Sequence, residues 1–169
     1  MARRRRVGLN SRDLAELSRE IHAQAQGIRG GAAASAMRIC EEVGLPKALE
    51  LCRSSRVSAN IHVERTATGA ALVADGPEAS YTEFGTGVVG QAAGFPTELD
   101  AAAAMASGYV HDGMGHGEAG WFYWDDGAWH WTKGLAGWGY MGAAAEAMRR
   151  DGAAIAMTEI VSDMRKGRQ

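Results

Sequence analysis

Apolar residues near the start of the chain recur at helical spacing, on one face, as far as Ile28. Asn10 followed three residues later by Asp13 is typical of a helix start. Glycines divide this region, and glycine is unfavourable inside a helix. The pattern therefore predicts three helices, separated by Gly30-Gly31 and by Gly44, over about 10–29, 32–43 and 46–53.

The next segments carry strand signals. Residues 57–64 alternate strictly between apolar and polar positions, as a half-buried strand does. After a short turn, residues 70–75 return as a second strand. Gly76-Pro77 then begins a short helix that ends at Phe84, where Gly85 supplies a left-handed cap.

Residues 86–119 lose this regularity, and we expect a long glycine-rich loop there. One helix is predicted inside it over 97–106, with Thr97 and Asp100 as a capping pair. A loop of this length in a compact domain is usually functional or mobile.

A regular strand pattern resumes in the aromatic segment from Trp121 to Trp131. The turn residues 125–127 contain Asp-Gly between aromatic segments, which favours a tight β-hairpin. Alternation places Trp121 and Tyr123 on one face and Phe122 and Trp124 on the other. We expect one face to cover the core and the other to contact a neighbouring subunit, because aromatic residues are enriched at interfaces.

A helical tail is predicted from Tyr140 to Lys166, with a kink or division at Gly152. The order of elements indicates an α+β fold, with a small, mostly antiparallel sheet of two β-hairpins packed against N-terminal and C-terminal helices. With 169 residues, 46% of them hydrophobic, the chain fits a single domain over 1–169 with a basic arm over 1–9. No run of 18 apolar residues is present, so no membrane partner is expected.

Charge and aromatic residues are unevenly distributed. All 12 aromatics lie between Tyr81 and Tyr140, and no Lys or Arg occurs between Arg65 and Lys133, where nine carboxylates do. The two ends of the chain are basic, although the formal net charge is only −2. Such segregation suits subunits that dock head to tail, or a surface that must repel nucleic acid.

The segment Glu83-Phe84-Gly85-Thr86-Gly87 is part of an ordered set of motifs. It is followed by a glycine-rich stretch, the aromatic hairpin, Thr132-Lys133-Gly134 and the step Tyr140-Met141 into the last helix. In this order, over about 9–165, the chain resembles the gene-product-ten-like putative tail-component family of lambda-related siphophages. It departs from that family at Gly139-Tyr140, where Pro-Phe is usual, and in its Gly/His-rich insert over 108–118.

The resemblance implies a structural virion protein at the neck of a tailed DNA phage, without catalytic activity. It implies a homo-oligomeric ring, with six-fold symmetry favoured over twelve-fold, that joins head to tail as a tail terminator, tail-completion protein or head–tail connector. Its partners would be the head-connector or stopper proteins and the tail-tube proteins. Packaged DNA would pass through the lumen without sequence-specific binding, and assembly would take place in the bacterial host cytoplasm.

No catalytic residue, cofactor site or metal site is assigned, and the expected sites are contacts between subunits. The candidate interface residues are Tyr81, Glu83, Phe84, Gly85, Thr86, Trp121, Tyr123, Trp129, Trp131, Trp138 and Tyr140. Arg3, Arg4, Arg5 and Arg6 are candidates for contact with a partner or with DNA. We further expect part of the acidic segment 75–126 to face the lumen or a basic neighbouring subunit.

Two other functional classes remain open from the sequence. A small metal-dependent hydrolase would use the ligand-type side chains of His111, Asp112, His116 and Glu118, although their spacing matches no standard site. A DNA-binding module would use the arginines of the arm, with affinity that falls steeply as salt rises. Neither explains the acidic, aromatic middle of the chain.

Overall fold

The computed structural model describes residues 11–76 and 78–166. The helical elements are α1 (Ser11–Ile39), the π-helical turn η1 (Cys40–Gly44), α2 (Leu45–Leu51), α3 (Ser55–Ser58), α4 (Ala79–Phe84), α5 (Gly87–Ala93), α6 (Glu98–Ser107), the 3-10 turn η2 (Gly117–Ala119) and α7 (Tyr140–Lys166). The strands are β1 (Ile61–Arg65), β2 (Ala70–Ala74), β3 (Gly85–Thr86), β4 (Trp121–Asp125), β5 (Ala128–Thr132) and β6 (Gly134–Ala136).

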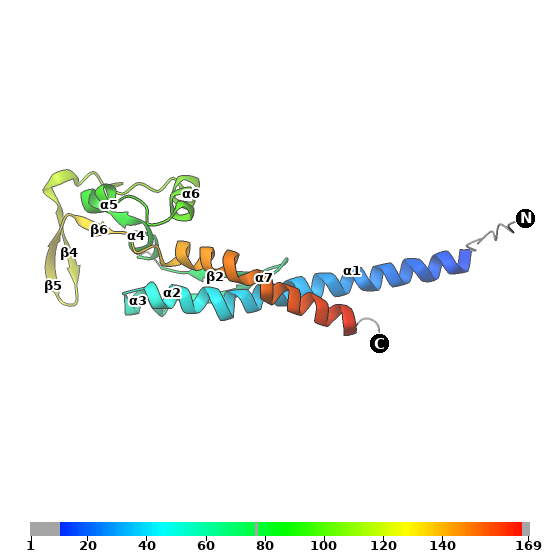
Figure 1. Ribbon diagram of the computed structural model, residues 1–169. Coiled ribbons are helices and arrows are strands. Elements are labelled where there is room, and N and C mark those ends of the chain that lie inside the picture. Colours follow the sequence, from blue (N-terminus) through cyan, green and yellow to red (C-terminus); the bar gives the residue numbers. More distant parts are fainter. Residues whose placement is uncertain (1–10, 77, 167–169) are drawn as a thin grey trace, which may run out of the picture.

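The molecule is elongated and has two parts (Figure 1). Helices α1, α2 and α7 form a rod, with the β1–β2 hairpin against it, and α4 to α6 with β3 to β6 form a head at one end. Among the described residues the strands form three antiparallel pairs, β1–β2, β3–β6 and β4–β5. The predicted α+β class is confirmed, although the strands form separate ladders and not one sheet.

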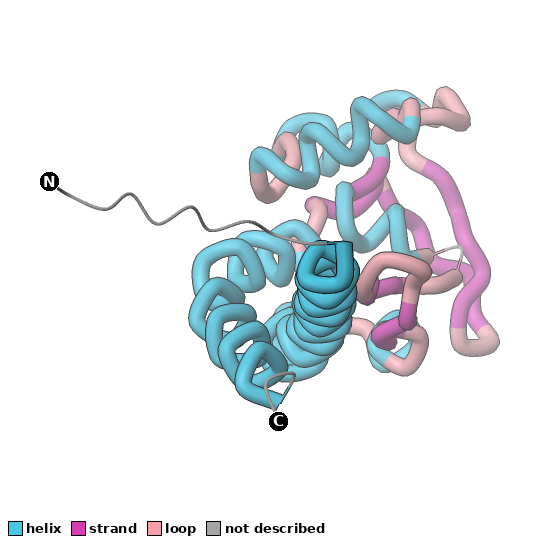
Figure 2. Tube along the Cα trace, turned by 90° about the vertical axis from the view of Figure 1, so that its right-hand side faces the viewer, coloured by secondary structure: helices cyan, strands magenta, loops and turns pink. Residues whose placement is uncertain are grey.

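Helix α1 runs unbroken from Ser11 to Ile39, so the predicted break at Gly30-Gly31 is wrong. Helices α1 and α7 lie side by side (Figures 1 and 2). A Cβ on Gly31 would stand 3.3 Å from the Cα of Ile160, so glycine permits a close approach of the two helices. Packing against α7 outweighs the cost of about 1 kcal/mol for a glycine within a helix.

The predicted helix end at Gly44 is also wrong. Residues Cys40–Gly44 form a π-helical turn that leads directly into α2, whose first turn contains Pro46 as predicted. Gly44 is buried against the side chain of Met148, where a Cβ would stand 2.5 Å from the sulfur. Its role is to let α7 approach, and not to end the helix.

The first half of the strand predicted over 57–64 is a helical turn. The hydroxyl of Ser54 accepts a hydrogen bond from the Val57 backbone N–H at 3.3 Å, which caps α3. Strand β1 begins only at Ile61 and pairs with β2, the second predicted strand, which is confirmed. Alternation alone did not separate the capped turn from the strand that follows it.

The segment 86–119 is more ordered than the predicted long loop, because it contains α5, α6 and η2. The helix predicted over 97–106 is confirmed as α6. Its capping box is complete: Asp100 N–H donates to the Thr97 hydroxyl at 3.1 Å, and Thr97 N–H donates to the Asp100 carboxylate at 3.1 Å.

The β4–β5 hairpin and the helix from Tyr140 to Lys166 have their predicted positions. Helix α7 continues through Gly152, so the predicted division of this helix is wrong; Gly152 faces the side chain of Ile39 in the rod. Gly85 ends α4 with a φ of 87° but a ψ of 163°, so it is extended and begins β3, where a left-handed cap was predicted. Such a φ still favours glycine.

The core lies where the rod meets the head. Tyr140 is the largest fully buried side chain described, with 0% exposure, and its hydroxyl donates to the Ala79 carbonyl at 3.0 Å. Small and branched residues surround it: Ala48, Val57, Ile61 and Ala144. No helix among the described residues combines the length and hydropathy needed to span a membrane.

Candidate functional site

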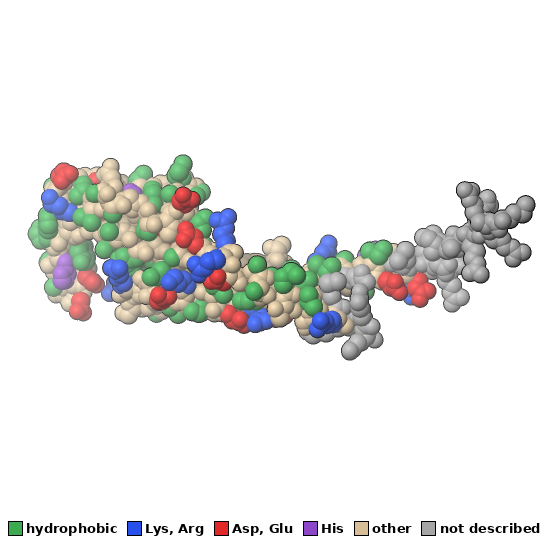
Figure 3. Space-filling view, viewed as in Figure 1, with side chains coloured by type: hydrophobic (Ala, Val, Ile, Leu, Met, Phe, Trp, Pro, Cys, Tyr) green, Lys and Arg blue, Asp and Glu red, His purple; other side chains and the backbone are tan. Residues whose placement is uncertain are grey.

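The β4–β5 hairpin presents four aromatic side chains on one exposed face. The register pairs Trp124 with Trp129 and Phe122 with Trp131, and directly opposed residues lie on the same side of a two-stranded sheet. These four residues are 52–67% exposed, and we call them the outward aromatic face. Hydrophobic side chains are visible on the surface at this end of the molecule (Figure 3).

The turn of the hairpin explains this register. Asp125 pairs with Ala128, which leaves a two-residue loop in which Asp126 and Gly127 have φ values of 46° and 77°. Positive φ at both loop residues is the geometry that joins two strands with their natural twist, and Asp-Gly favours it. The rings of Trp124 and Trp129 meet edge to face, with centroids 5.4 Å apart.

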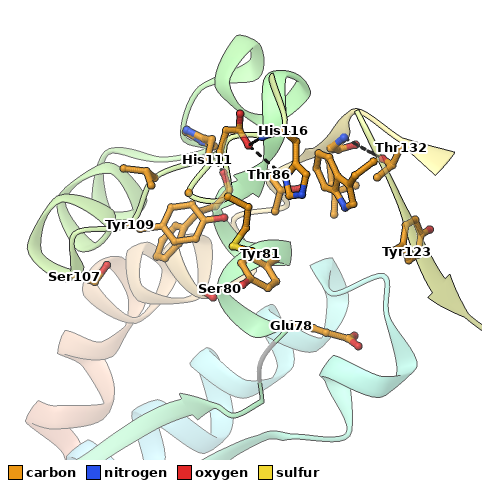
Figure 4. A pocket seen from close by; sticks show the side chains of 18 of the residues that line it. Glu78, Ser80, Tyr81, Thr86, Ser107, Tyr109, His111, His116, Tyr123 and Thr132 are labelled. Atoms are coloured by element: carbon orange, nitrogen blue, oxygen red, sulfur yellow. Dashed lines mark hydrogen bonds and ion pairs between the residues drawn. The ribbon is translucent and has the colours of Figure 1, made fainter. Parts of the chain in front are cut away.

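The opposite face of the hairpin looks into an open groove of about 1120 Å³ (Figure 4). Trp121 and Tyr123, together with atoms of Trp124, Asp125 and Thr132, form the hairpin side of this groove, which we call the aromatic groove. Tyr81 of α4 and Tyr109 lie on the other side. This face was expected to cover the core or an interface, but it lines a cavity, and Tyr123 is 44% exposed.

One arginine joins the hairpin to the rest of the protein across the mouth of the groove. The Arg56 guanidinium donates to Glu78 at 2.7 Å and to Asp125 at 3.1 Å. All three side chains are largely exposed to solvent, so the pairs contribute little to stability. They do fix where the tip of the hairpin stands relative to α3 and α4.

The Gly/His-rich segment over 108–118 forms a wall of the groove and is held by its own polar groups. The Asp112 carboxylate accepts hydrogen bonds from the backbone N–H groups of His116 and Gly117, at 2.8 and 2.7 Å. These bonds hold the pKa of Asp112 below its ordinary value. His116 stacks on Trp121 with ring centroids 4.3 Å apart, and so connects this segment to β4.

The four ligand-type residues of the hydrolase alternative do not converge on one point. His111 uses its Nε2 atom for a hydrogen bond with the Phe84 carbonyl at 3.1 Å. Among the described residues, the one group of three or more potential ligands within reach of a single ion is elsewhere, at His62, Glu64 and Asp75 on the β1–β2 hairpin. The sequence analysis missed that group, although His62 and Glu64 lie two apart in a strand and so share a face.

The Glu83-Phe84-Gly85 motif fixes the head to the start of α7. The Glu83 carboxyl accepts hydrogen bonds from the backbone N–H groups of Met141 and Gly142, at 3.0 and 2.8 Å. Burial, together with a hydrogen bond to the neighbouring Asp100 carboxyl, raises the pKa of Glu83 to about 8. Glu83 therefore connects α4 to the start of α7 through a carboxyl group that holds its proton more tightly than a free one does.

Glu83, Gly85 and Tyr140 were predicted as interface residues, but all three are buried within the protomer. Their contacts are internal: Gly85 pairs with Ala136 of β6, and a Cβ at this position would collide with the backbone of Gly137. The structure gives these three residues roles in holding the head together, and not on its surface.

The other predicted interface residues have mixed positions. Tyr81 is 51% exposed, and Thr86 lines the aromatic groove. Phe84 is half-buried against the rings of Phe95 and Tyr109, and Trp138 packs against the core. Arg3 to Arg6 lie outside the described residues.

Phe122 and Trp124 belong to the outward aromatic face but were not among the predicted interface residues. The two-residue turn at 126–127 contains the signal that would have found them. It makes Trp129 and Trp131 the partners of Trp124 and Phe122, whereas the prediction named Trp129 and Trp131 as interface residues together with Trp121 and Tyr123. Comparison of the chain with known protein families, with curated protein sequences and with solved structures finds no match.

Proposed function

We propose that this chain is a structural protein of a tailed DNA phage, and that it forms a homo-oligomeric ring at the neck, where head and tail join. In this role the protein acts by assembly and performs no catalysis. It would contact head-connector or stopper proteins on one side and tail-tube proteins on the other. The DNA would pass through the ring lumen.

The observation that carries this proposal is the way the motifs of the resemblance meet in space. The segment 83–87, the residues after the hairpin and the step into α7 are far apart in sequence, yet they form one packed unit. Gly85 and Thr86 pair with Ala136 and Leu135 of β6, and Gly87 bridges to Gly134. Glu83 binds the first backbone amides of α7. A shared structural unit is a physical reason for these motifs to occur together and in this order.

The outward aromatic face supports an assembly role. Four large aromatics exposed on one side of a hairpin form a patch of the kind that marks a protein–protein contact. No Lys or Arg occurs in β4 or β5, although Lys133 lies over the Trp131 ring with its Nζ 5.9 Å from the ring centroid. One lysine beside four aromatic side chains offers few contacts to phosphate, which nucleic-acid binding depends on. We assign the outward aromatic face to the contact between subunits or with the next protein of the neck.

The decisive test is deletion of this gene from the phage or prophage that encodes it, followed by negative-stain imaging of the lysate. We expect DNA-filled heads beside separate tails, and complementation from a plasmid should restore joined particles. Tails of abnormal length would identify a tail terminator. Intact, infectious virions would overturn the proposal.

A further inference from the structure

The aromatic groove has the chemical character of a site for guanidinium groups. Its walls carry the exposed rings of Tyr81 and Tyr123, and arginine stacks well on such rings. Three carboxylates line the groove, Glu78, Asp112 and Asp125, against one arginine, Arg56, and two histidines. Asp112 is engaged by backbone amides, so Glu78 and Asp125 are the carboxylates that face an incoming cation.

The groove already holds one guanidinium. Arg56 bridges Glu78 and Asp125 while its own side chain stays 65% exposed. The two carboxylates are therefore placed at a spacing that a planar cation fits, and each has further oxygen lone pairs for more donors. A second arginine that enters the groove would find carboxylate oxygens at one end and aromatic rings along its length.

The chain itself supplies a segment of matching chemistry. Arg3 to Arg6 are four consecutive arginines, and no carboxylate occurs before Asp13. The segment 66–132, which forms most of the groove, has nine carboxylates and no Lys or Arg. The strongest positive run of the sequence and its most acidic segment are thus complementary in charge.

The arm cannot reach the groove of its own protomer. Ten extended residues span at most about 36 Å. Helix α1 alone has 29 residues and, at 1.5 Å per residue, is about 44 Å long. It begins at the end of the rod away from the head, while the groove lies in the head, beyond the other end of α1 (Figure 1). Any contact between the arm and a groove is therefore between two copies.

We propose that Arg3 to Arg6 of one copy bind in the aromatic groove of a second copy, between Glu78 and Asp125 and against Tyr81 and Tyr123. This deepens the proposed ring function and rests on it for its biological meaning. The contact joins different surfaces of the two copies, so it is heterologous, and such contacts close into rings when the rotation permits.

The test uses the full chain, with self-association measured by sedimentation velocity and mass photometry at low salt. An arm variant (R3A/R4A/R5A/R6A) and a groove variant (E78Q/D125N) should each associate at least about tenfold more weakly than wild type, from the loss of several ion pairs and stacking contacts. Matched controls alter exposed charges elsewhere: R53A/R65A/R149A for the arm, and E98Q/E146Q for the groove. Both controls should associate as wild type does.

Mixing the two defective variants gives the sharpest result. The arm variant keeps an intact groove and the groove variant keeps an intact arm, so one contact per pair can form. We expect a heterodimer and no larger species. If either variant alone associates as strongly as wild type, the proposal is overturned.

A synthetic peptide of residues 1–10 tests the contact directly. It should bind the arm variant, lose affinity as salt is raised, and bind several-fold more weakly when its arginines are replaced by lysines, which stack less well and lack the planar fork. Loss of duplex-DNA binding in an arm variant that still self-associates would make the arm a DNA contact and overturn the proposal. Rings that form without the arm would also overturn this proposal. They would not contradict the proposed neck function, which the gene deletion tests separately.

Discussion

The core around Tyr140 and the β4–β5 hairpin use apolar residues in opposite ways. The core is built from one large ring among alanines, Val57 and Ile61, with helices brought close by glycines such as Gly31 and Gly44. The ten residues of β4 and β5 include six large aromatics, and the outward aromatic face of the hairpin is left in solvent. Three of the five tryptophans, Trp124, Trp129 and Trp131, are therefore left largely exposed in the isolated protomer.

This difference separates stability from assembly. Burial stabilises by about 25 cal/mol for each Å² of apolar surface removed from water. An exposed tryptophan therefore contributes little of this free energy to the folding of the protomer. The same free energy would contribute to association when a partner covers the outward aromatic face. Substitutions in the core should therefore act on folding, and substitutions on the hairpin should act on association.

The largest expected effect comes from Tyr140→Ala. Tyr140 is fully buried and its hydroxyl donates to the Ala79 carbonyl, so truncation leaves a cavity and removes one of the hydrogen bonds to that carbonyl, which also accepts from the Thr82 hydroxyl at 3.1 Å. We expect a loss of about 3–5 kcal/mol in the free energy of unfolding, measured by urea denaturation. Tyr140→Phe keeps the ring and should lose only about 1 kcal/mol. Equal losses for the two variants would mean that the ring does not fill the core.

The second effect is a pH dependence of folding that comes from Glu83. Its pKa is raised from 4.5 to about 8, so the folded protein binds this proton more tightly than the unfolded chain. The stabilisation is complete below pH 4.5, is lost as pH rises toward 8, and is constant above that. At about 1.4 kcal/mol per pKa unit, the change is on the order of a few kcal/mol.

Glu83→Gln checks this dependence. The amide cannot ionise, so the fall in stability between these pH values should flatten, although its NH₂ group cannot accept the hydrogen bond of one of the two α7 amides and the overall stability should fall. Glu98→Gln, at an exposed position of α6, should leave the pH profile as in wild type. A wild-type profile in Glu83→Gln would assign the dependence to another group.

Much of the fold could be predicted from the sequence where local signals and packing agree. The Thr97–Asp100 capping box, the β4–β5 turn and the start of α7 at Tyr140 all depend on neighbours in sequence. The wrong helix breaks at Gly30-Gly31 and Gly44 occurred where a distant contact decides. In the local sequence, Gly31 and Gly44 resemble helix breakers. In the structure they lie within helices, because Ile160 and Met148 of α7 pack so close that a side chain at either position would crowd them.

The candidate site could be predicted in part. The alternation of residues 121–124 predicted which side chains share a face of β4, and the local composition predicted that the region is acidic and aromatic. Which face stays open depends on the space left between β4 and α4, and no local pattern encodes that. The bond of Glu83 to the amides at the start of α7 joins residues 58 and 59 positions apart, so sequence reasoning placed a buried residue on a surface.

The third prediction tests the hairpin side of the comparison. Trp124→Ala and Trp129→Ala should each change the free energy of unfolding by less than about 1 kcal/mol, the range of a cross-strand pair. Self-association should weaken at least about tenfold, because aromatic residues dominate interfaces. Met105→Ala removes an 81% exposed apolar side chain from α6 and is the matched control, with no effect on either measurement. A loss of stability like that of Tyr140→Ala would mean that the hairpin is part of the folding core.

The smallest expected effect is that of Arg56→Gln, which breaks the ion pairs between Asp125, Glu78 and α3. Exposed pairs of this kind contribute about 0–1 kcal/mol, so global stability should hardly change. Amide hydrogen exchange in β4 and β5 should nevertheless become faster, because the tip of the hairpin loses its contact across the groove. Lys47→Gln removes an exposed pair with Glu50 and should leave hairpin exchange unchanged. Unchanged exchange in Arg56→Gln would show that the hairpin is held from its base alone, through Trp121 and His116, and that its two faces are set independently of the rod.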